Sequence, residues 1–303
     1  MYHAGSLNSF LDRPNALSGG NCFPNGSHLI DRIPSDLQSM SSLEIGLLIL
    51  SAFVPCAIFV IWSWSTELTD RQSLLSVLSV FLMGATISVG LALVLEIAAQ
   101  SLLAEGLGLE SGAAILTVLG AVVVAPVFEE LTKMLPILAA GMSSEFSELE
   151  DGLIYGAAAG FGFAATENLL YFFVSWRESL MMPAGLGLLS LVVLIIVRSI
   201  GSACVHGAAS SFSGLGIASR RFLHGSVLGG YVKAVGLHAA FNLTLVLFGA
   251  LLVCDMPVTC AIPLAFSLLI GLVSFSWTIR RIRALDEQPN VQMVDSGGPD
   301  DQD

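Results

Sequence analysis

Charged side chains are scarce in this sequence. Asp, Glu, Lys and Arg make up 12% of its 303 residues, whereas 54% are hydrophobic. A soluble globular domain carries roughly 25% charged residues, so this composition argues against a soluble fold. Several apolar runs exceed the ~18 residues that mark a membrane-spanning helix. No stretch alternates apolar with polar residues as the strands of a membrane β-barrel do. The sequence therefore predicts an all-α, polytopic membrane helix bundle.

Basic residues are few as well: 12 Lys and Arg stand against 24 Asp and Glu, which gives a formal net charge of −12. Nucleic-acid binding needs a basic patch, so we expect no nucleic-acid partner. The five cysteines form no CxxC pair, which argues against a thiolate zinc site. Cys254 and Cys260 flank one short loop. They could form a disulfide if that loop faces an oxidising compartment, and two free thiols are the alternative.

The composition divides the chain into three regions. Residues 1–42 are polar, and we expect a disordered tail without a cleavable signal peptide. Residues 280–303 begin with the basic "RRIR" and end as an acidic polar tail. Residues 43–279 form the membrane-embedded domain. Within it we expect about seven spans, near residues 43–64, 74–99, 112–140, 152–175, 184–206, 223–251 and 259–279.

Lys and Arg in short loops predict the orientation, because they gather on the cytoplasmic side. With the N-terminus outside, six loop arginines lie inside and three lie outside. The inner ones are Arg71, Arg220, Arg221, Arg280, Arg281 and Arg283, and the outer ones are Arg13, Arg32 and Arg177. We therefore expect a multi-pass protein of the cell membrane, held by the lipid bilayer, with its N-terminus outside and its C-terminus in the cytoplasm.

Against this apolar background, four consecutive predicted spans carry ionisable side chains. Such groups are costly at membrane depth and usually face the bundle interior or a wet cavity. In the third span, Lys133 stands within helical reach of both Glu129 and Glu130. The next three spans hold Glu167 with Asn168, Arg198 with His206, and Lys233 with His238 and Asn242. We expect their polar faces to converge on one interior site.

Each of these groups also has a purely structural interpretation. Lys133 could form an ion pair with one of the two glutamates that only fixes helix packing. The second glutamate would then remain as a buried carboxylate without a counter-ion. Glu167 could merely pair with Arg198, which is itself better explained as a supporting residue. His206 stands at the predicted end of its span, where an interfacial histidine is common.

The motifs resemble those of the PrsW family of intramembrane proteases. They are "EELTK" (129–133), "FAATEN" (163–168), a single His at the end of the next span, and "HAAFN" (238–242), in this order on four successive spans. The resemblance covers roughly residues 120–250. The related CAAX prenyl proteases have EExxxR and FxxxH. Here the base comes one residue earlier and the second motif ends in Glu, which favours the PrsW branch and argues against a prenyl-protein substrate.

The resemblance implies hydrolysis of peptide bonds in membrane-bound protein substrates. The founding role of the family is a first cut in a membrane-bound anti-sigma factor. By motif position, the implied catalytic residues are Glu129, Glu130, Glu167, His206, His238 and Asn242, with Lys133 and Arg198 in support. The chemistry agrees independently, because amide hydrolysis needs a base for water and a donor for the oxyanion. Glu129 or Glu130 could be the base, and Asn242 or a histidine could hold the oxyanion.

The residues leave the participation of a metal open. Two His and one Glu form a recognised catalytic zinc set, which His206, His238 and Glu167 or one of the paired glutamates could supply. HExxH is absent, and the ligands would come from separate helices. We therefore expect catalysis without a cofactor and keep Zn²⁺ as the alternative. Members of the family are described as metalloproteases and their relatives as glutamate proteases.

Two other functions compete with the peptidase. A proton-coupled transporter or channel would also place Glu, His and Lys in spans, but no second set of broken helices suggests an inverted repeat. A non-catalytic scaffold could bind single-span proteins. However, every candidate motif position here carries a reactive side chain.

Overall fold

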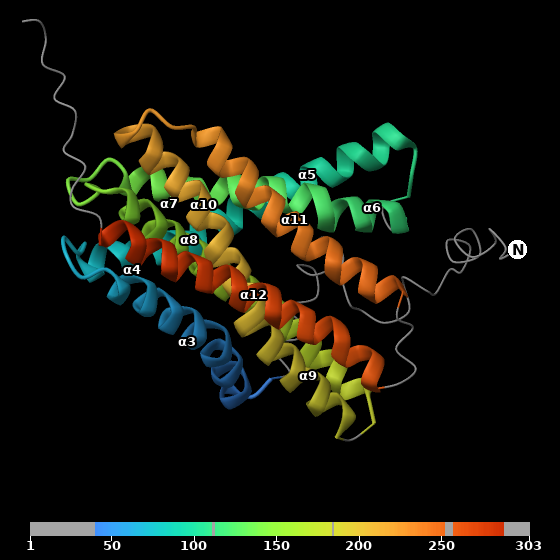
Figure 1. The fold of residues 1–303 in the computed structure, drawn as a ribbon. Coiled ribbons are helices and arrows are strands. Elements are labelled where there is room, and N and C mark those ends of the chain that lie inside the picture. The colour runs from blue at the N-terminus through green and yellow to red at the C-terminus, as the bar shows by residue number, and fades with distance from the viewer. Residues whose placement is uncertain (1–39, 111–112, 184, 252–256, 288–303) are drawn as a thin grey trace, which may run out of the picture.

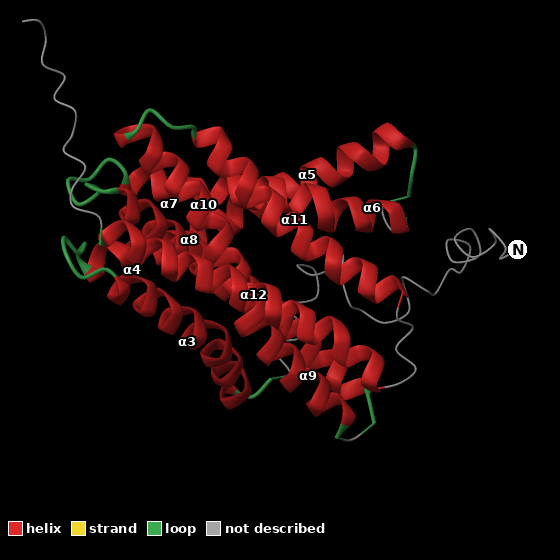
Figure 2. Cartoon of the chain, in the orientation of Figure 1, coloured by secondary structure: helices red, strands yellow, loops and turns green. Residues whose placement is uncertain are grey.

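The computed structural model describes residues 40–110, 113–183, 185–251 and 257–287. This part of the chain is helical and contains no strand (Figure 2). Seven of its helical stretches are long and apolar enough to cross a membrane, which confirms the predicted all-α membrane bundle. In chain order they are α3 (Ser42–Thr66), α4–η1–α5 (Leu74–Leu107), α6–η2–α7 (Ala114–Ala140), α8 (Leu149–Met181), α9–η3–α10 (Leu186–Phe222), α11 (Val227–Leu251) and α12 (Pro257–Asp286).

Some of the expectations concern residues outside the described ranges. The predicted disorder of the N-terminal tail falls on residues 1–39, and the acidic end of the chain begins after residue 287. Cys254 and the side chain of Cys260 also lie outside the description. The predicted pairing of these two cysteines therefore stays a prediction.

Local sequence signals set several helix ends. The Ser41 hydroxyl accepts a hydrogen bond from the Glu44 amide, and the Glu44 carboxylate accepts one from the Ser41 amide, so a capping box starts α3. Glu148 and Asp151 form the same reciprocal arrangement at the start of α8. Gly108 ends α5 with a φ of 63°, a left-handed conformation that glycine adopts without strain.

Helix α8 is the central helix of the bundle and contacts α3, α4, α7, α9, α10 and α12 (Figure 1). In its most apolar window 72% of the residues are buried, against 22% for α3 and for α11. The run "YGAAAGFGFAA" (155–165) consists mostly of Gly and Ala. Because these side chains are small, neighbouring helices can approach the α8 backbone from several sides.

The closest of these approaches joins α8 to α10. Gly152, Gly156 and Gly160 lie four residues apart and so share one face of α8. A Cβ atom at any of them would overlap a backbone carbonyl of α10, and the carbonyl at Gly160 is that of His206. Only glycine fits at these positions, and the contact fixes the backbone of His206 against α8.

Three of the spans contain a wide π-helical turn: η1 (Gly84–Ser88), η2 (Gly120–Val124) and η3 (Arg198–Ser202). Such turns disturb the regular backbone bonding and are frequent at functional sites. A carbonyl in each turn accepts a hydrogen bond from a polar side chain of another helix. The donors are Thr166 to Ala85 at 2.6 Å, Asn242 to Ala121 at 2.8 Å and Asn168 to Arg198 at 3.3 Å. These bonds matter because lipid offers no water to the freed carbonyl.

Several helices extend beyond the predicted spans, and the fifth span does so furthest. The span expected to end at His206 continues to Phe222, so His206 lies inside a continuous helix and is buried in the bundle. The added part, "GAASSFSGLGIAS" (207–219), is rich in small and polar residues and lacks the hydropathy of a lipid-facing helix. It packs against the glycine face of α8 instead. Similarly, α12 continues through "RRIR" to Asp286.

Candidate active site

Helix α7 (Ala125–Ala140) brings the first three charged side chains of the site into the bundle interior. The ammonium group of Lys133 lies 3.2 Å from Glu129 Oε2 and 2.8 Å from Glu130 Oε1. Lys133 and Glu130 are fully buried, and Glu129 is only 6% exposed. The helical spacing thus predicted the pairing correctly. One base is shared between two acids, which leaves the group one positive charge short.

His206, from α10, bridges this group to Glu167. Its Nδ1 lies 2.7 Å from Lys133 Nζ, and its Nε2 lies 3.0 Å from Glu167 Oε2. An ammonium group can only donate, so Nδ1 accepts, and Nε2 must carry the proton that goes to Glu167. In this arrangement His206 is neutral, and both of its nitrogens are engaged. Phe163, one turn before Glu167, covers the Lys133 ammonium at 4.1 Å from its ring centre.

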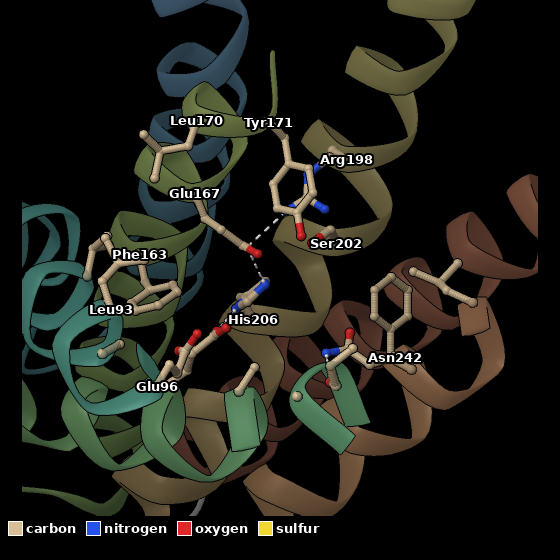
Figure 3. Close-up of a pocket in the computed structure, with 18 of the residues that line it drawn as sticks. Leu93, Glu96, Phe163, Glu167, Leu170, Tyr171, Arg198, Ser202, His206 and Asn242 are labelled. Atoms are coloured by element: carbon tan, nitrogen blue, oxygen red, sulfur yellow. Dashed lines mark hydrogen bonds and ion pairs between the residues drawn. The ribbon is translucent and has the colours of Figure 1, made fainter. Parts of the chain in front are cut away.

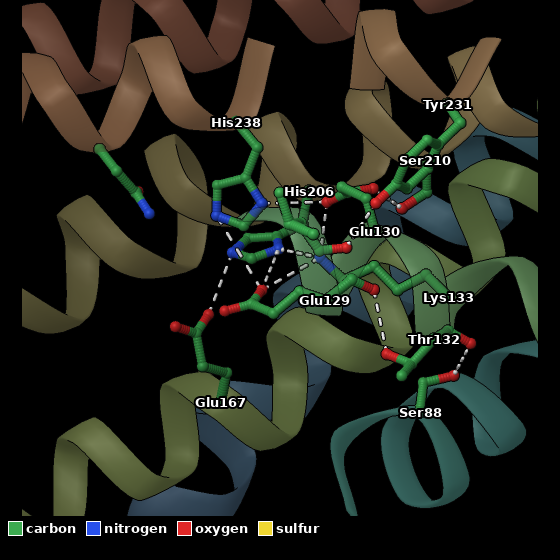
Figure 4. Close-up of polar contacts among 12 residues, drawn as sticks. Ser88, Glu129, Glu130, Thr132, Lys133, Glu167, His206, Ser210, Tyr231 and His238 are labelled. Carbon is green, nitrogen blue, oxygen red and sulfur yellow. Dashed lines mark hydrogen bonds and ion pairs between the residues drawn. The ribbon is translucent and has the colours of Figure 1, made fainter. Parts of the chain in front are cut away.

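His238, from α11, contributes the second imidazole (Figure 4). Its Nδ1 lies 3.0 Å from Glu130 Oε1, and its Nε2 lies 3.9 Å from Glu129 Oε2. The other Glu130 oxygen accepts a hydrogen bond from Ser210 Oγ at 3.1 Å. Glu130 is therefore held from three sides and orients its neighbours. The 3.9 Å between Glu129 Oε2 and His238 Nε2 is too long for a hydrogen bond, so His238 Nε2 is not bonded to Glu129.

Glu167 has a second partner in Arg198, whose Nη2 lies 3.0 Å from Glu167 Oε2. Arg198 is itself held in place: its Nε donates to Asn168 at 3.0 Å, and its guanidinium stacks 3.6 Å from the ring centre of Tyr171. The expected pairing of Glu167 with Arg198 is present. It is not the whole role of Glu167, because the same carboxylate also binds His206.

Asn242 lies four residues after His238 on α11 and contacts none of the charged groups directly. Its Nδ2 donates to the carbonyl of Ala121 in the π turn η2 at 2.8 Å. A side-chain amide carries two N–H groups, so this bond leaves one of them unused. Asn242 lines the cavity described next, which keeps the remaining donor near the site.

A cavity of about 140 Å³ adjoins these groups and gives access to them (Figure 3). Such a volume holds several water molecules. Glu129, Glu167, Arg198, His206 and Asn242 all line it. Four of the six predicted catalytic residues and the predicted supporting residue Arg198 therefore meet at one cavity. The sequence analysis did not single out five other polar side chains of the same wall, which are Glu96, Gln100, Thr117, Tyr171 and Ser202. Glu96 could have been found, since it is an acid inside an apolar predicted span.

The donor set fits a divalent metal ion. Glu129, His206 and His238 offer ligand atoms that lie within 4.8 Å of one another, and all three are buried. The carboxylate in this group is Glu129, whereas Glu167 lies on the far side of His206. The contact of Glu130 with His238 also matches the carboxylate partner that usually orients a metal-bound histidine. However, a cation bound through His206 Nδ1 would take the place of the Lys133 ammonium group.

Comparison with known proteins agrees with the order of the motifs. The family described as PrsW family intramembrane metalloprotease matches residues 72–270. The curated "Protease PrsW" of Clostridioides difficile (strain 630) is 32% identical over 132 residues, which are 43% of this chain and 52% of that protein. The match thus spans about half the length of the curated relative. No solved structure gives a significant match.

Proposed function

Because this chain belongs to the PrsW family of intramembrane metalloproteases, we propose that it is an intramembrane peptidase that hydrolyses peptide bonds of membrane-bound proteins. One observation carries the proposal. Glu129 lines a cavity inside the helix bundle and is surrounded by a base and two histidines from three different helices. Carboxylate, imidazole and amide donors around a wet cavity are the groups that amide hydrolysis requires.

Glu129 is the better candidate for the general base. Glu130 is fully buried and bonded to Lys133, His238 and Ser210, so it has little freedom to accept another proton. Glu129 faces the cavity and is bonded through one oxygen to Lys133. We assign to Glu129 the proton of the attacking water and its return to the leaving amine as the C–N bond breaks. Glu130 then acts as a positioning residue for Lys133 and His238.

Asn242 is the candidate donor for the oxyanion. One N–H of its amide is fixed on the Ala121 carbonyl, which orients the second N–H relative to the cavity. The negative charge that develops on the substrate carbonyl oxygen would accept this second hydrogen bond. The assignment explains why an asparagine, with two donors, stands at this position.

Zn²⁺ remains the alternative way of activating water. Glu129, His206 and His238 would hold the ion, which would polarise the carbonyl and lower the pKa of a bound water. Glu129 would then be a ligand, and Lys133 would have to leave His206 Nδ1. These two roles of Glu129 exclude each other, so a chelator separates them.

The candidate substrates are single-span regulatory proteins of the membrane, such as an anti-sigma factor. The rival transporter function is less well supported, because the polar contacts of the described residues close on one another at one cavity. A transporter needs polar groups that continue across the bilayer.

The test is cleavage of a set of single-span proteins by the detergent-purified protein, with and without a chelator. We expect Glu129→Gln to lower the rate by about 10²–10⁴-fold, the range of a lost general base. Glu130→Gln and His238→Ala should also impair cleavage. The control is Glu105→Gln, which changes an exposed acid of α5 and should leave cleavage unaltered.

The effect of the chelator on cleavage distinguishes the general-base mechanism from the zinc mechanism. If cleavage continues in the presence of the chelator, Glu129 is supported as the general base. If the chelator abolishes cleavage and added zinc restores it, Glu129, His206 and His238 are supported as metal ligands. Wild-type cleavage that persists unchanged in all three site variants would contradict the site.

A further inference from the structure

Glu96 is a carboxylate of the cavity wall that the site described above does not use. It belongs to a face of α5 (Val89–Leu107) formed by residues spaced three or four apart, which are Val89, Ala92, Leu93, Glu96 and Gln100. Glu96 is the charged member of that face. Figure 3 shows it projecting from α5 into the same space as Glu167 and His206.

The permanent positive charges around the cavity already form ion pairs with other carboxylates. Lys133 is shared by Glu129 and Glu130. Arg198 is paired with Glu167. Within the described residues, Glu96 has no hydrogen bond and no ion pair. The cavity region thus holds four acids, with Glu96 the fourth, against two permanent bases.

A carboxylate at membrane depth without a counter-ion is costly, so such a residue commonly marks a pathway or a binding site. The same cavity is also lined by apolar side chains, which include Leu93, Phe163 and Leu245. Apolar side chains together with a carboxylate that has no partner suit a side chain with an alkyl stem and a cationic head. Lys and Arg have this shape.

We propose that Glu96 is a specificity-determining residue that binds the Lys or Arg side chain of a substrate next to the scissile bond. The inference rests on the proposed peptidase function, since it assigns a subsite to the same cavity. The binding partner is adjacent to the cleaved peptide because Glu96 and Glu129 line one continuous space. Glu96 would gain its missing counter-charge only when a substrate with a basic residue is bound.

The first experiment varies the substrate. A single-span protein that the wild type cleaves is remade with Lys, norleucine or Glu at positions around the scissile bond. Norleucine keeps the alkyl stem of lysine without the charge. Wild type and Glu105→Gln should cleave the Lys substrate with a kcat/KM at least ~10-fold above the norleucine substrate at one position.

Glu96→Gln should bring this ratio close to one, while the norleucine substrate is cleaved as by the wild type. Glu96→Lys should favour Glu at the same position. Two outcomes overturn the proposal. One is a Lys-to-norleucine ratio that Glu96→Gln leaves unaltered. The other is an equal loss of kcat for all substrates, which would make Glu96 part of the chemistry.

A second experiment needs no cleavage. n-Butylammonium carries the charge of lysine on four carbons, and n-butanol is its neutral counterpart. The amine should raise the Tm of the wild type above the effect of the alcohol, and Glu96→Gln should abolish this difference. An equal effect of both compounds on the wild type would contradict the subsite. If the wild type cleaves none of the substrates, the proposed peptidase function fails, while the amine experiment still decides the role of Glu96.

Discussion

The two sides of the candidate site are built in opposite ways. On one side α8 and α10 meet through glycines, so closely that a Cβ atom at Gly160 would overlap the carbonyl of His206. On the other side α5 and the π turn η2 line a cavity of about 140 Å³, and they meet there through the flexible side chain of Gln100. The contrast separates two tasks. Backbone contact on the tight side fixes His206 and Glu167, whereas the open side holds the cavity that our proposal assigns to water and substrate.

The largest expected effect comes from breaking the tight side. Gly160→Val would force the His206 backbone away from α8, and a displacement of about 1 Å at a catalytic group costs roughly 100-fold in rate. We expect cleavage to fall at least that far and the Tm to drop. Gly236→Val is the control, since a Cβ at this exposed glycine of α11 meets nothing within 4 Å. Equal effects of the two substitutions would refute the distinction between the two sides.

An intermediate effect is expected where α11 is joined to η2. Asn242→Ala would leave the Ala121 carbonyl without its donor, which costs about 1–3 kcal/mol for a buried polar group. Both the Tm and the cleavage rate should fall. Thr244→Ala serves as the control, because Thr244 is partly exposed and its hydroxyl donates to the carbonyl of Ala240 within its own helix. A stable Asn242→Ala protein with normal cleavage would exclude both roles assigned to this amide.

The smallest effect should come from a glycine on the open side. A Cβ at Gly120 would lie 3.0 Å from the Nε2 atom of Gln100, which is the far end of a flexible side chain and can move aside. Alanine also has the better helix propensity. We expect Gly120→Ala to change stability by less than about 0.5 kcal/mol, as measured by thermal unfolding in detergent. A loss as large as that of Gly160→Val would show that the cavity wall is as rigid as the α8–α10 contact.

The sequence predicted those parts of the site that lie within one helix. Lys133 reaches both glutamates because they stand three and four residues before it. The seven spans followed from hydropathy and length alone. The sequence also predicted that the motif residues face the interior of the bundle, because charged side chains avoid lipid.

Apart from the pairing of Glu167 with Arg198, the contacts between helices could not be predicted from the sequence. Nothing in the spacing places Lys133 against His206, because this contact depends on how closely glycines let α10 approach α8. The role of Asn242 depends on the π turn η2, and a wide turn leaves no clear signature in the run "GAVVV". Hydropathy also ended the fifth span at His206, because the rest of that helix is covered by protein and not by lipid.

The ion pairs within α7 also bear on how this span enters the membrane during synthesis. Lys133 finds Glu129 and Glu130 on its own helix, so the segment can enter the bilayer with one excess negative charge instead of three separate ions. The remaining partners of Glu130, Ser210 and His238, are made 80 and 108 residues later. The ion pairs within α7 can therefore form while this segment is inserted into the membrane. Its contacts with other helices can form only after α10 and α11 have been synthesised.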